Sequence, residues 1–460
     1  MIRLFNHWLH LRTLLVMGTD FAFVILGVIG MALWLGNGAL LGDKVVIACS
    51  IALALCALAI NAWAGFYQDT RNTTRLQAIS RAAFSVSLAA LFAYGMFSFA
   101  PFASEGHEVL ALPAMTAVLG MVVHRLGAVR VGASSMLVRR VLIFGAGEHA
   151  LAVRRALDKS DPNVQIVGFY PSPTEESIQV PEDRVLPVSS SLTDTVRSLD
   201  VDEIVVALSE RRGGAMPLRE LLDCKLLGVK VLDLASHFEQ ALGQIRLDSL
   251  RAGWLIFGDG FRQGWVRTAV KRLFDISCAL VLLLVSLPVM LVAAVLIVLE
   301  SGFPVFYRQE RVGLNGRLFN VIKFRSMRTD AEKDGKPRWA TGNDSRVTRV
   351  GRLIRKTRID ELPQLISVLK GDMSLVGPRP ERPFFVDQLT RDIPFYAVRH
   401  SVKPGLTGWA QVRYHYGASV EDSAEKLQYD LYYVKNHTLF LDLIVLFETV
   451  GVVLTGKGAQ

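Results

Sequence analysis

Long apolar runs separated by short polar loops make up the first 124 residues of the chain. Most of these runs approach the ~20 residues that an α-helix needs to cross ~30 Å of hydrocarbon. The last run is shorter and contains Pro113. The pattern predicts an N-terminal four-helix transmembrane bundle within residues 1–130, with spans at about 14–35, 45–67, 82–100 and 109–123.

The loops between these runs alternate in charge. Arginines lie before the first run, between the second and third, and after the fourth, whereas the loop 101–108 contains neither Lys nor Arg. Because cytoplasmic loops of membrane proteins carry the excess of Lys and Arg, both the N-terminus and everything after residue 124 are predicted to be cytoplasmic. The apolar start lacks a cleavage site of small residues, so we expect a retained anchor.

From residue 131 to 250, short apolar strands alternate with helical stretches. The strands read "VLIF", "VQIVGFY", "EIVVALS" and "VKVLDL". This alternation predicts a central α/β Rossmann-like domain with a parallel sheet. Gly145 and Gly147 follow the first strand, where a dinucleotide fold approaches a phosphate, but the second strand runs into "YPSP" without an acid to bind a ribose. The turn is therefore a candidate nucleotide-binding site in a domain that is otherwise structural or regulatory.

A second kind of apolar segment, at about 271–300, has basic residues on both sides. Basic residues on both sides favour a cytoplasmic position for both ends of the segment. A re-entrant helix, which enters and leaves the membrane on one face, has both ends on that side. Pro288 removes a backbone donor and crowds the carbonyl of Leu284, and Ser286 can bond back to the helix, so we expect the helix to break there. The alternative is a plain fifth span, which would put everything after residue 300 outside.

Composition supports a membrane protein and locates its charge. The hydrophobic fraction is 51%, the mean hydropathy is +0.34 and the net charge is +9. Residues 301–360 contain 15 Lys or Arg against 6 Asp or Glu, which matches the net charge of the whole chain. Such a patch suits lipid head groups, a phosphate-bearing substrate or nucleic acid, or is a solvated surface. The four cysteines show neither metal-ligand nor disulfide spacing, so we expect reduced packing residues.

Two adjacent acids, Asp360 and Glu361, follow this basic run in "TRIDELPQL". The structural interpretation is a helix that begins at Asp360 as its N-cap, tolerates Pro363 in its first turn and ends at Gly371. The functional interpretation starts from the arginines around the pair. A carboxylate surrounded by cations stays ionised at neutral pH, and an ionised aspartate can attack phosphorus.

Three strings in this part of the chain carry a family resemblance. They are "YRQERVGLNGRLFNVIKFRSMRTDAE", "GRLIRKTRIDELPQLISVLKGDMSLVGPRPERP" and "RHSVKPGLTGWAQVRYHYG". In this order after a basic-flanked apolar helix, they resemble the bacterial sugar transferase family, the monotopic polyprenol-phosphate hexose-1-phosphate transferases. The resemblance covers about 267–460, and the two preceding regions are similar to those of the family's long, three-domain members. It implies a C-terminal α-rich phosphoglycosyl transferase domain at 251–460 with a re-entrant helix.

The resemblance also implies roles for the two acids. Asp360 is expected to attack the sugar-linked phosphorus of a nucleoside diphosphate sugar and to form a covalent phosphosugar, which polyprenyl phosphate then takes over. Glu361 is expected to hold Mg²⁺, a hard cation that prefers carboxylate and phosphate oxygens.

Basic residues near the acids are candidates for phosphate binding. Arg355 precedes the pair by five residues, and Arg379 lies in "GPRP", where two prolines stiffen the backbone. Weaker candidates are Lys323, Arg325, Arg399, His400 and Lys403. One departure from the family concerns the helix break: many members have serine directly before the breaking proline, whereas Leu287 separates Ser286 from Pro288 here.

As a whole, the resemblance implies an initiating enzyme of exopolysaccharide, capsule or O-antigen synthesis. It would transfer a hexose-1-phosphate, glucose or galactose, from a UDP-sugar to undecaprenyl phosphate and release UMP. The protein would be a homodimer in the bacterial inner membrane, in contact with membrane lipid but not with nucleic acid, and its catalytic domain would lie on the cytoplasmic face.

Two other functions remain open at this stage. One is a membrane-anchored nucleotide-sugar oxidoreductase or dehydratase that uses the Rossmann-like turn. The missing ribose-binding acid and the absence of a convincing Tyr-x-x-x-Lys pair count against it. The other is a polysaccharide-assembly scaffold whose basic face holds anionic lipid.

Overall fold

The computed structural model divides the chain into two compact units. The first comprises residues 1–4 and 8–237, and the second comprises residues 5–7 and 238–460. Each unit has its own hydrophobic core. The residues that the structure describes are 2–4, 7–9, 11–34, 44–63, 85, 87–92, 94–95, 120, 138–160, 164–172, 175, 178–188, 191–208, 216–250, 260–261, 264–328, 346–414 and 419–455.

Two apolar helices follow the short strands β1 (Ile2–Leu4) and β2 (His7–Leu9). They are α1 (Leu11–Trp34) and α2 (Lys44–Trp63), which pack against each other. They coincide with the first two predicted spans, and α1 is long and apolar enough to cross a membrane. Of the third predicted span only residues 85, 87–92 and 94–95 are described, and of the fourth only residue 120, all of them helical. The four-helix bundle therefore stays a prediction.

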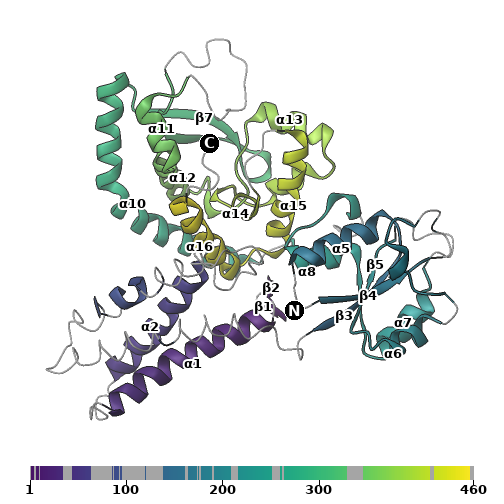
Figure 1. Ribbon diagram of the computed structural model, residues 1–460. Helices are drawn as coiled ribbons and strands as arrows, with labels where there is room; N and C mark the ends of the chain where they lie inside the picture. The colour runs from purple at the N-terminus through teal and green to yellow at the C-terminus, as the bar shows by residue number, and fades with distance from the viewer. Residues whose placement is uncertain are drawn as a thin grey trace. The chain divides into compact units, whose positions relative to one another are not determined.

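A parallel sheet forms the centre of the first unit, with the strand order β4-β3-β5-β6. Figure 1 labels β3, β4 and β5 of this sheet. All three strand pairs are parallel, as the alternating pattern predicts. A core of strand residues such as Leu142, Phe144 and Ile204 lies beneath the helices. The dinucleotide-binding version of this fold stays a prediction. The elements are β3 (Arg139–Phe144), α5 (Glu148–Ser160), β4 (Val164–Tyr170), η3 (Glu182–Arg184), α6 (Leu192–Ser198), β5 (Glu203–Val206), α7 (Leu218–Leu226), β6 (Lys230–Asp233) and α8 (Leu234–Leu242).

The second unit surrounds one antiparallel hairpin and one short parallel strand pair with helices. Its main part starts at residue 238 and so includes residues 238–250, which the sequence pattern assigned to the preceding domain. Its elements are η4 (Leu247–Ser249), α10 (Trp265–Ser301), β7 (Phe306–Val312), η5 (Leu314–Gly316), β8 (Leu318–Phe324), α11 (Arg349–Lys356), η6 (Ile359–Gln364), α12 (Leu365–Lys370), β9 (Ser374–Val376), α13 (Pro383–Asp392), η7 (Tyr396–Ser401), β10 (Gly405–Thr407), α14 (Trp409–Arg413), α15 (Val420–Asn436) and α16 (Leu439–Thr455).

The apolar segment expected to break at Pro288 is a single helix, α10, that continues across the proline. Figure 1 shows it as an uninterrupted ribbon whose axis changes direction part-way along. Ser286 does bond back to the helix, through Oγ to the carbonyl of Leu283 at 3.4 Å. One proline costs an internal helix one hydrogen bond, and the long apolar run on either side keeps the helical pattern intact. The expected break is therefore wrong, while the re-entrant path stays a prediction.

The first turns of α10 are fixed to the rest of the second unit by charged groups. Lys271 Nζ lies 2.7 Å from Asp442 Oδ2, and Asp275 Oδ1 accepts a bond from the amide of Leu375 at 3.3 Å. Arg272 donates to the carbonyls of Val368 and Leu369, which end α12. Because charges and helix ends are joined here, the start of α10 has a defined direction relative to the hairpin and α12.

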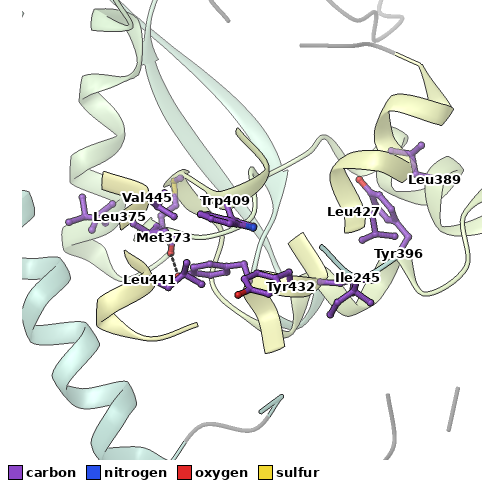
Figure 2. Packing of buried hydrophobic residues seen from close by; sticks show 14 of the residues in the cluster. Ile245, Met373, Leu375, Leu389, Tyr396, Trp409, Leu427, Tyr432, Leu441 and Val445 are labelled. Atoms are coloured by element: carbon purple, nitrogen blue, oxygen red, sulfur yellow. Dashed lines mark hydrogen bonds between the residues drawn. The ribbon is translucent and has the colours of Figure 1, made fainter. Parts of the chain in front are cut away.

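Aromatic packing forms the centre of the second core, and Figure 2 shows Trp409 against Tyr432. Their ring centroids are 5.8 Å apart. The indole Nε1 of Trp409 donates to the carbonyl of Gly243 at 2.7 Å, and only 2% of the residue is exposed. Trp409 is therefore a core residue of the second unit.

Candidate active site

The acidic pair lies on η6, a short 3-10 helix between α11 and α12. Thr357 is the C-cap of α11, and the next residue, Arg358, takes the left-handed conformation with φ 59°. For a residue with a side chain this conformation costs about 1–2 kcal/mol, so tertiary contacts must hold it. The reversal turns the chain so that Asp360 and Glu361 both enter the unit, each with 8% of its surface exposed.

Asp360 is not the N-cap that the sequence pattern predicts. Arg358 occupies the capping position, and no side chain caps η6. The regular α-helix, α12, starts only at Leu365, after Pro363, and it ends as predicted at Gly371, where φ is 96°. The left-handed Arg358 moves the start of the turn two residues towards the N-terminus, which leaves the carboxylate of Asp360 without a capping role.

Three cations converge on one oxygen of Glu361. Its Oε1 lies 2.8 Å from Arg379 Nη2, 3.2 Å from Lys323 Nζ and 3.7 Å from Arg358 Nη1. Lys323 comes from β8, which packs against η6, and Arg379 from the loop after β9. Burial opposes the charge of Glu361, but the three cations outweigh burial and hold the pKa of Glu361 well below its usual range. Glu361 is therefore a fixed anion.

Asp360 differs from Glu361 in both its hydrogen bonds and its pKa. Within the described part of the chain, its Oδ1 is buried and has no hydrogen-bond partner. Burial and the adjacent charge of Glu361 raise the pKa of Asp360 to about 6, although Lys323, Arg358 and Arg379 act in the opposite direction. The arginine-rich surroundings thus stabilise Glu361 most, and Asp360 keeps a desolvated carboxylate that is still mainly ionised at neutral pH.

Two further sequence candidates take different positions. Arg325 is 6% exposed, and its Nη2 donates to the carbonyls of Ser301 and Gly302 at the end of α10. Arg355 lies half-buried in the last turn of α11. The structure therefore joins Lys323 and Arg379 to the acidic pair, and it joins Arg325 to the end of the apolar helix.

In the string "RHSVKPG", Arg399 is a buried residue that holds the loop of Arg379 in place. Arg399 is 6% exposed and binds Asp430 through Nη2 at 2.7 Å and the carbonyl of Arg379 at 3.0 Å. Burial lowers the pKa of His400 to about 4, so its ring is neutral, and burial also lowers the pKa of Lys403. Arg399 thus fixes the backbone of the residue whose side chain holds Glu361.

Sequence reasoning missed two residues. Arg358 was not among the candidates, although its position three residues before Glu361 lets both side chains meet on one turn. Glu175, in the first unit, was also missed. The amides of Ala146 and Gly147 in the candidate nucleotide-binding turn both donate to its carboxylate. An acid was sought at the end of β4, whereas this one comes five residues after Tyr170.

Among the described residues no three Asp, Glu, His or Cys side chains come together as metal ligands. Mg²⁺ in phosphoryl-transfer sites is held by one or two carboxylates together with substrate phosphates. Asp360 Oδ1, which is buried next to Glu361 and has no hydrogen-bond partner among the described residues, fits an ion of that kind. The pair is therefore compatible with a cation that arrives with a diphosphate.

The second unit matches known proteins over most of its length. The sequence profile of the family described as Bacterial sugar transferase matches residues 266–456. An uncharacterized sugar transferase of Bacillus subtilis is 44% identical over 191 residues, which cover 42% of this chain and 90% of that protein. The chain belongs to the bacterial sugar transferase family. The matched segment of this chain contains the acidic pair, its three cations and all of α10 except its first residue.

Two longer relatives have names that state a substrate. The UDP-N-acetylgalactosamine-undecaprenyl-phosphate N-acetylgalactosaminephosphotransferase of Aeromonas hydrophila is 45% identical, over 53% of this chain and 56% of the relative. The UDP-glucose:undecaprenyl-phosphate glucose-1-phosphate transferase of Xanthomonas campestris is 32% identical, over 70% of this chain and 68% of the relative. Similar sugar transferases thus carry names with different sugars.

Proposed function

We propose that this sugar transferase moves a sugar-1-phosphate from a UDP-sugar to undecaprenyl phosphate and so initiates the synthesis of a bacterial polysaccharide. The observation that carries the proposal is the division of the acidic pair: Glu361 is bound by three cations, while Oδ1 of the buried Asp360 has no hydrogen-bond partner within the described residues. The names of similar proteins supply the substrate classes.

In the proposed reaction, an ionised oxygen of Asp360 attacks the phosphorus that bears the sugar. An oxygen–phosphorus bond forms, the bond to the bridging diphosphate oxygen breaks, and UMP leaves with the electron pair. An oxygen of undecaprenyl phosphate then attacks the same phosphorus, which forms the lipid diphosphate and returns the carboxylate. A pKa of about 6 suits this role, because Asp360 is mainly ionised at neutral pH and more basic than an ordinary aspartate.

The cations support charge stabilisation in this scheme. In-line transfer at phosphorus depends mainly on positioning and on groups that meet the developing charge. Arg379 offers a planar guanidinium, and Lys323 and Arg358 lie around the same carboxylate. Glu361 and Asp360 are the residues that would hold Mg²⁺. When bound with the diphosphate, that ion neutralises negative charge on the leaving phosphate.

The apolar helix supports a reaction at the bilayer surface. Leu284, Val285 and Leu299 of α10 are 75%, 71% and 76% exposed, which suits contact with lipid tails. In the proposed arrangement α10 enters the inner membrane from the cytoplasmic side, and the acidic pair lies near the plane of the lipid phosphates. We also propose a homodimer, which the mass of the detergent-solubilised protein tests.

One assay tests the function and identifies the sugar. Membranes that contain the protein are supplied with Mg²⁺, undecaprenyl phosphate and, one at a time, UDP-glucose, UDP-galactose and their N-acetylated forms, and UMP release is measured. We expect release with one of these donors and its loss in Asp360→Asn. Asp387→Asn, a change at an exposed aspartate of α13, is the matched control.

The same assay separates the competing functions. A polysaccharide-assembly scaffold would release no UMP from any donor and would bind anionic liposomes in a salt-sensitive way. An oxidoreductase or dehydratase would change the donor without forming UMP. Either result would overturn the proposed transfer.

A further inference from the structure

A carboxylate occupies the glycine turn of the first unit. Glu175 Oε2 accepts a hydrogen bond from the amide of Ala146 at 2.8 Å, and Oε1 accepts one from Gly147 at 3.0 Å. The amide of Ser172 adds a third bond to Oε2 at 3.2 Å. Both oxygens of one side chain are therefore held by backbone donors, in the way that such turns hold an oxyanion.

These amides are the groups that a phosphate would need. Ala146 and Gly147 lie between the end of β3 and the start of α5 at Glu148. At this point of a dinucleotide fold, the helix dipole and the unpaired amides bind pyrophosphate. In this chain the two amide donors are already used, and a negative carboxylate lies where the negative phosphate would lie.

The backbone around Glu175 holds it over the turn. The amide of Glu175 bonds to the carbonyl of Ser172 at 3.1 Å, and the amide of Gln179 bonds to the carbonyl of Ala146 at 2.8 Å. The first bond closes a local turn between Ser172 and Glu175, and the second attaches the segment after Glu175 to the glycine turn. Its carboxylate is one part of a connected set of bonds.

The two glycines are also explained without a nucleotide. Gly145 has φ +123°, and a Cβ there would lie 2.9 Å from the carbonyl oxygen of Ala207. A Cβ on Gly147 would lie 3.2 Å from Glu175 Oε1. The group that leaves little room for a side chain at position 147 is therefore the carboxylate of Glu175.

We propose that Glu175 is the built-in anion of this turn, and that the first unit therefore does not bind a nucleotide phosphate there. The turn keeps the geometry of a phosphate site, but an internal carboxylate replaces the ligand and joins the segment after β4 to the start of α5. A free phosphate gains access to the two amides only after the carboxylate is removed. The inference concerns the first unit alone and does not depend on the transferase reaction.

Hydrogen exchange in the full-length, detergent-solubilised protein tests this role. The peptide that contains Ala146 and Gly147 is followed by mass spectrometry in the wild type and in Glu175→Ala, each with and without millimolar pyrophosphate. We expect exchange at these amides to be at least about tenfold faster in the variant, the change that corresponds to loss of one hydrogen bond to a charged group. Pyrophosphate should slow exchange in the variant and leave the wild type unchanged.

Two further variants complete the test. Glu175→Gln keeps the shape of the side chain but retains only one acceptor oxygen, so one of the two amides should lose protection even if the alanine variant misfolds. Glu182→Ala, at an exposed acid of η3, is the control and should behave like the wild type. Unchanged exchange in both Glu175 variants would overturn the proposal, and so would slower exchange in the wild type with pyrophosphate or a dinucleotide.

Discussion

Arg379 donates its hydrogen bond to Glu361, with 2.8 Å between Nη2 and Oε1. Lys323 and Arg358 approach the same oxygen. The neighbouring acid, Asp360, is as deeply buried but has an oxygen without a hydrogen-bond partner within the described residues. Two adjacent carboxylates in one basic environment therefore differ in pKa and in hydrogen bonding. This difference is the physical basis of the proposed division of roles.

The pH dependence of the first half-reaction should report Asp360. Burial and Glu361 raise its pKa to about 6, and only the ionised form attacks phosphorus. Below that pH Asp360 is protonated, so kcat/KM for the UDP-sugar should fall as pH decreases through about 6 and level off above it. Initial rates of UMP release between about pH 5 and 8 measure this profile. A flat profile across that range would contradict the assignment.

Glu361→Gln should change both the rate and the profile. Without the charge of Glu361, one cause of the raised pKa of Asp360 disappears and the three cations remain. The acid limb should therefore move to lower pH, and kcat should fall about 10²–10³-fold, the effect of removing a group that organises charge in a site. The pH profile is the decisive measurement, because a merely unstable variant would lose rate without moving the limb.

Arg399 should act as a positioning residue for Arg379. Its guanidinium spans the carboxylate of Asp430 and the carbonyl of Arg379, and Lys cannot make both bonds in one fixed geometry. Arg399→Lys should therefore lower kcat/KM by about 10–100-fold, whereas Arg391→Lys, on the exposed face of α13, should not.

The coupling to Asp430 separates positioning from general damage. If the pair acts as a unit, adding Asp430→Asn to Arg399→Lys should cost little more than the single change. Wild-type kcat/KM in Arg399→Lys, or fully additive losses in the double variant, would remove Arg399 from the account.

Arg325 should matter for stability more than for substrate binding. Its Nη2 binds the carbonyls of Ser301 and Gly302 and so closes the end of α10. Arg325→Ala should lower the free energy of unfolding by about 1.5–3 kcal/mol, the range for a hydrogen bond to a charged group. Thermal unfolding and KM for the donor are measured together. A large rise in KM with unchanged stability would instead support the phosphate-binding role that the sequence suggested.

Local patterns predicted the parts of this protein whose cause is local. The lengths of the apolar runs predicted α1, α2 and the apolar character of α10. The alternation of strands and helices predicted the parallel pairing of β3 with β4 and β5. The meeting of Lys323, Glu361 and Arg379 joins segments up to 56 residues apart. The family strings brought those residues together, because periodicity carries no information about such distances.

Backbone reversals and burial of charge could not be read in the same way. The left-handed Arg358 displaced the expected N-cap, and nothing in "KTRID" marks a non-glycine residue for that conformation. Arg325 and Arg399 were weaker candidates for phosphate binding, but each donates to carbonyls or a carboxylate in the interior. Glu175 was hidden by its distance from β4, since only the fold returns it to the turn.

The most direct test of the central claim is a search for the phosphosugar on Asp360. The protein is incubated with Mg²⁺ and the active UDP-sugar without undecaprenyl phosphate, quenched in acid, digested and analysed by mass spectrometry. The account predicts a sugar-phosphate mass increase on the peptide that contains Asp360, its absence in Asp360→Asn, and its loss from the wild type when undecaprenyl phosphate is added. UMP release with full turnover in Asp360→Asn, or an adduct on another residue, would contradict it.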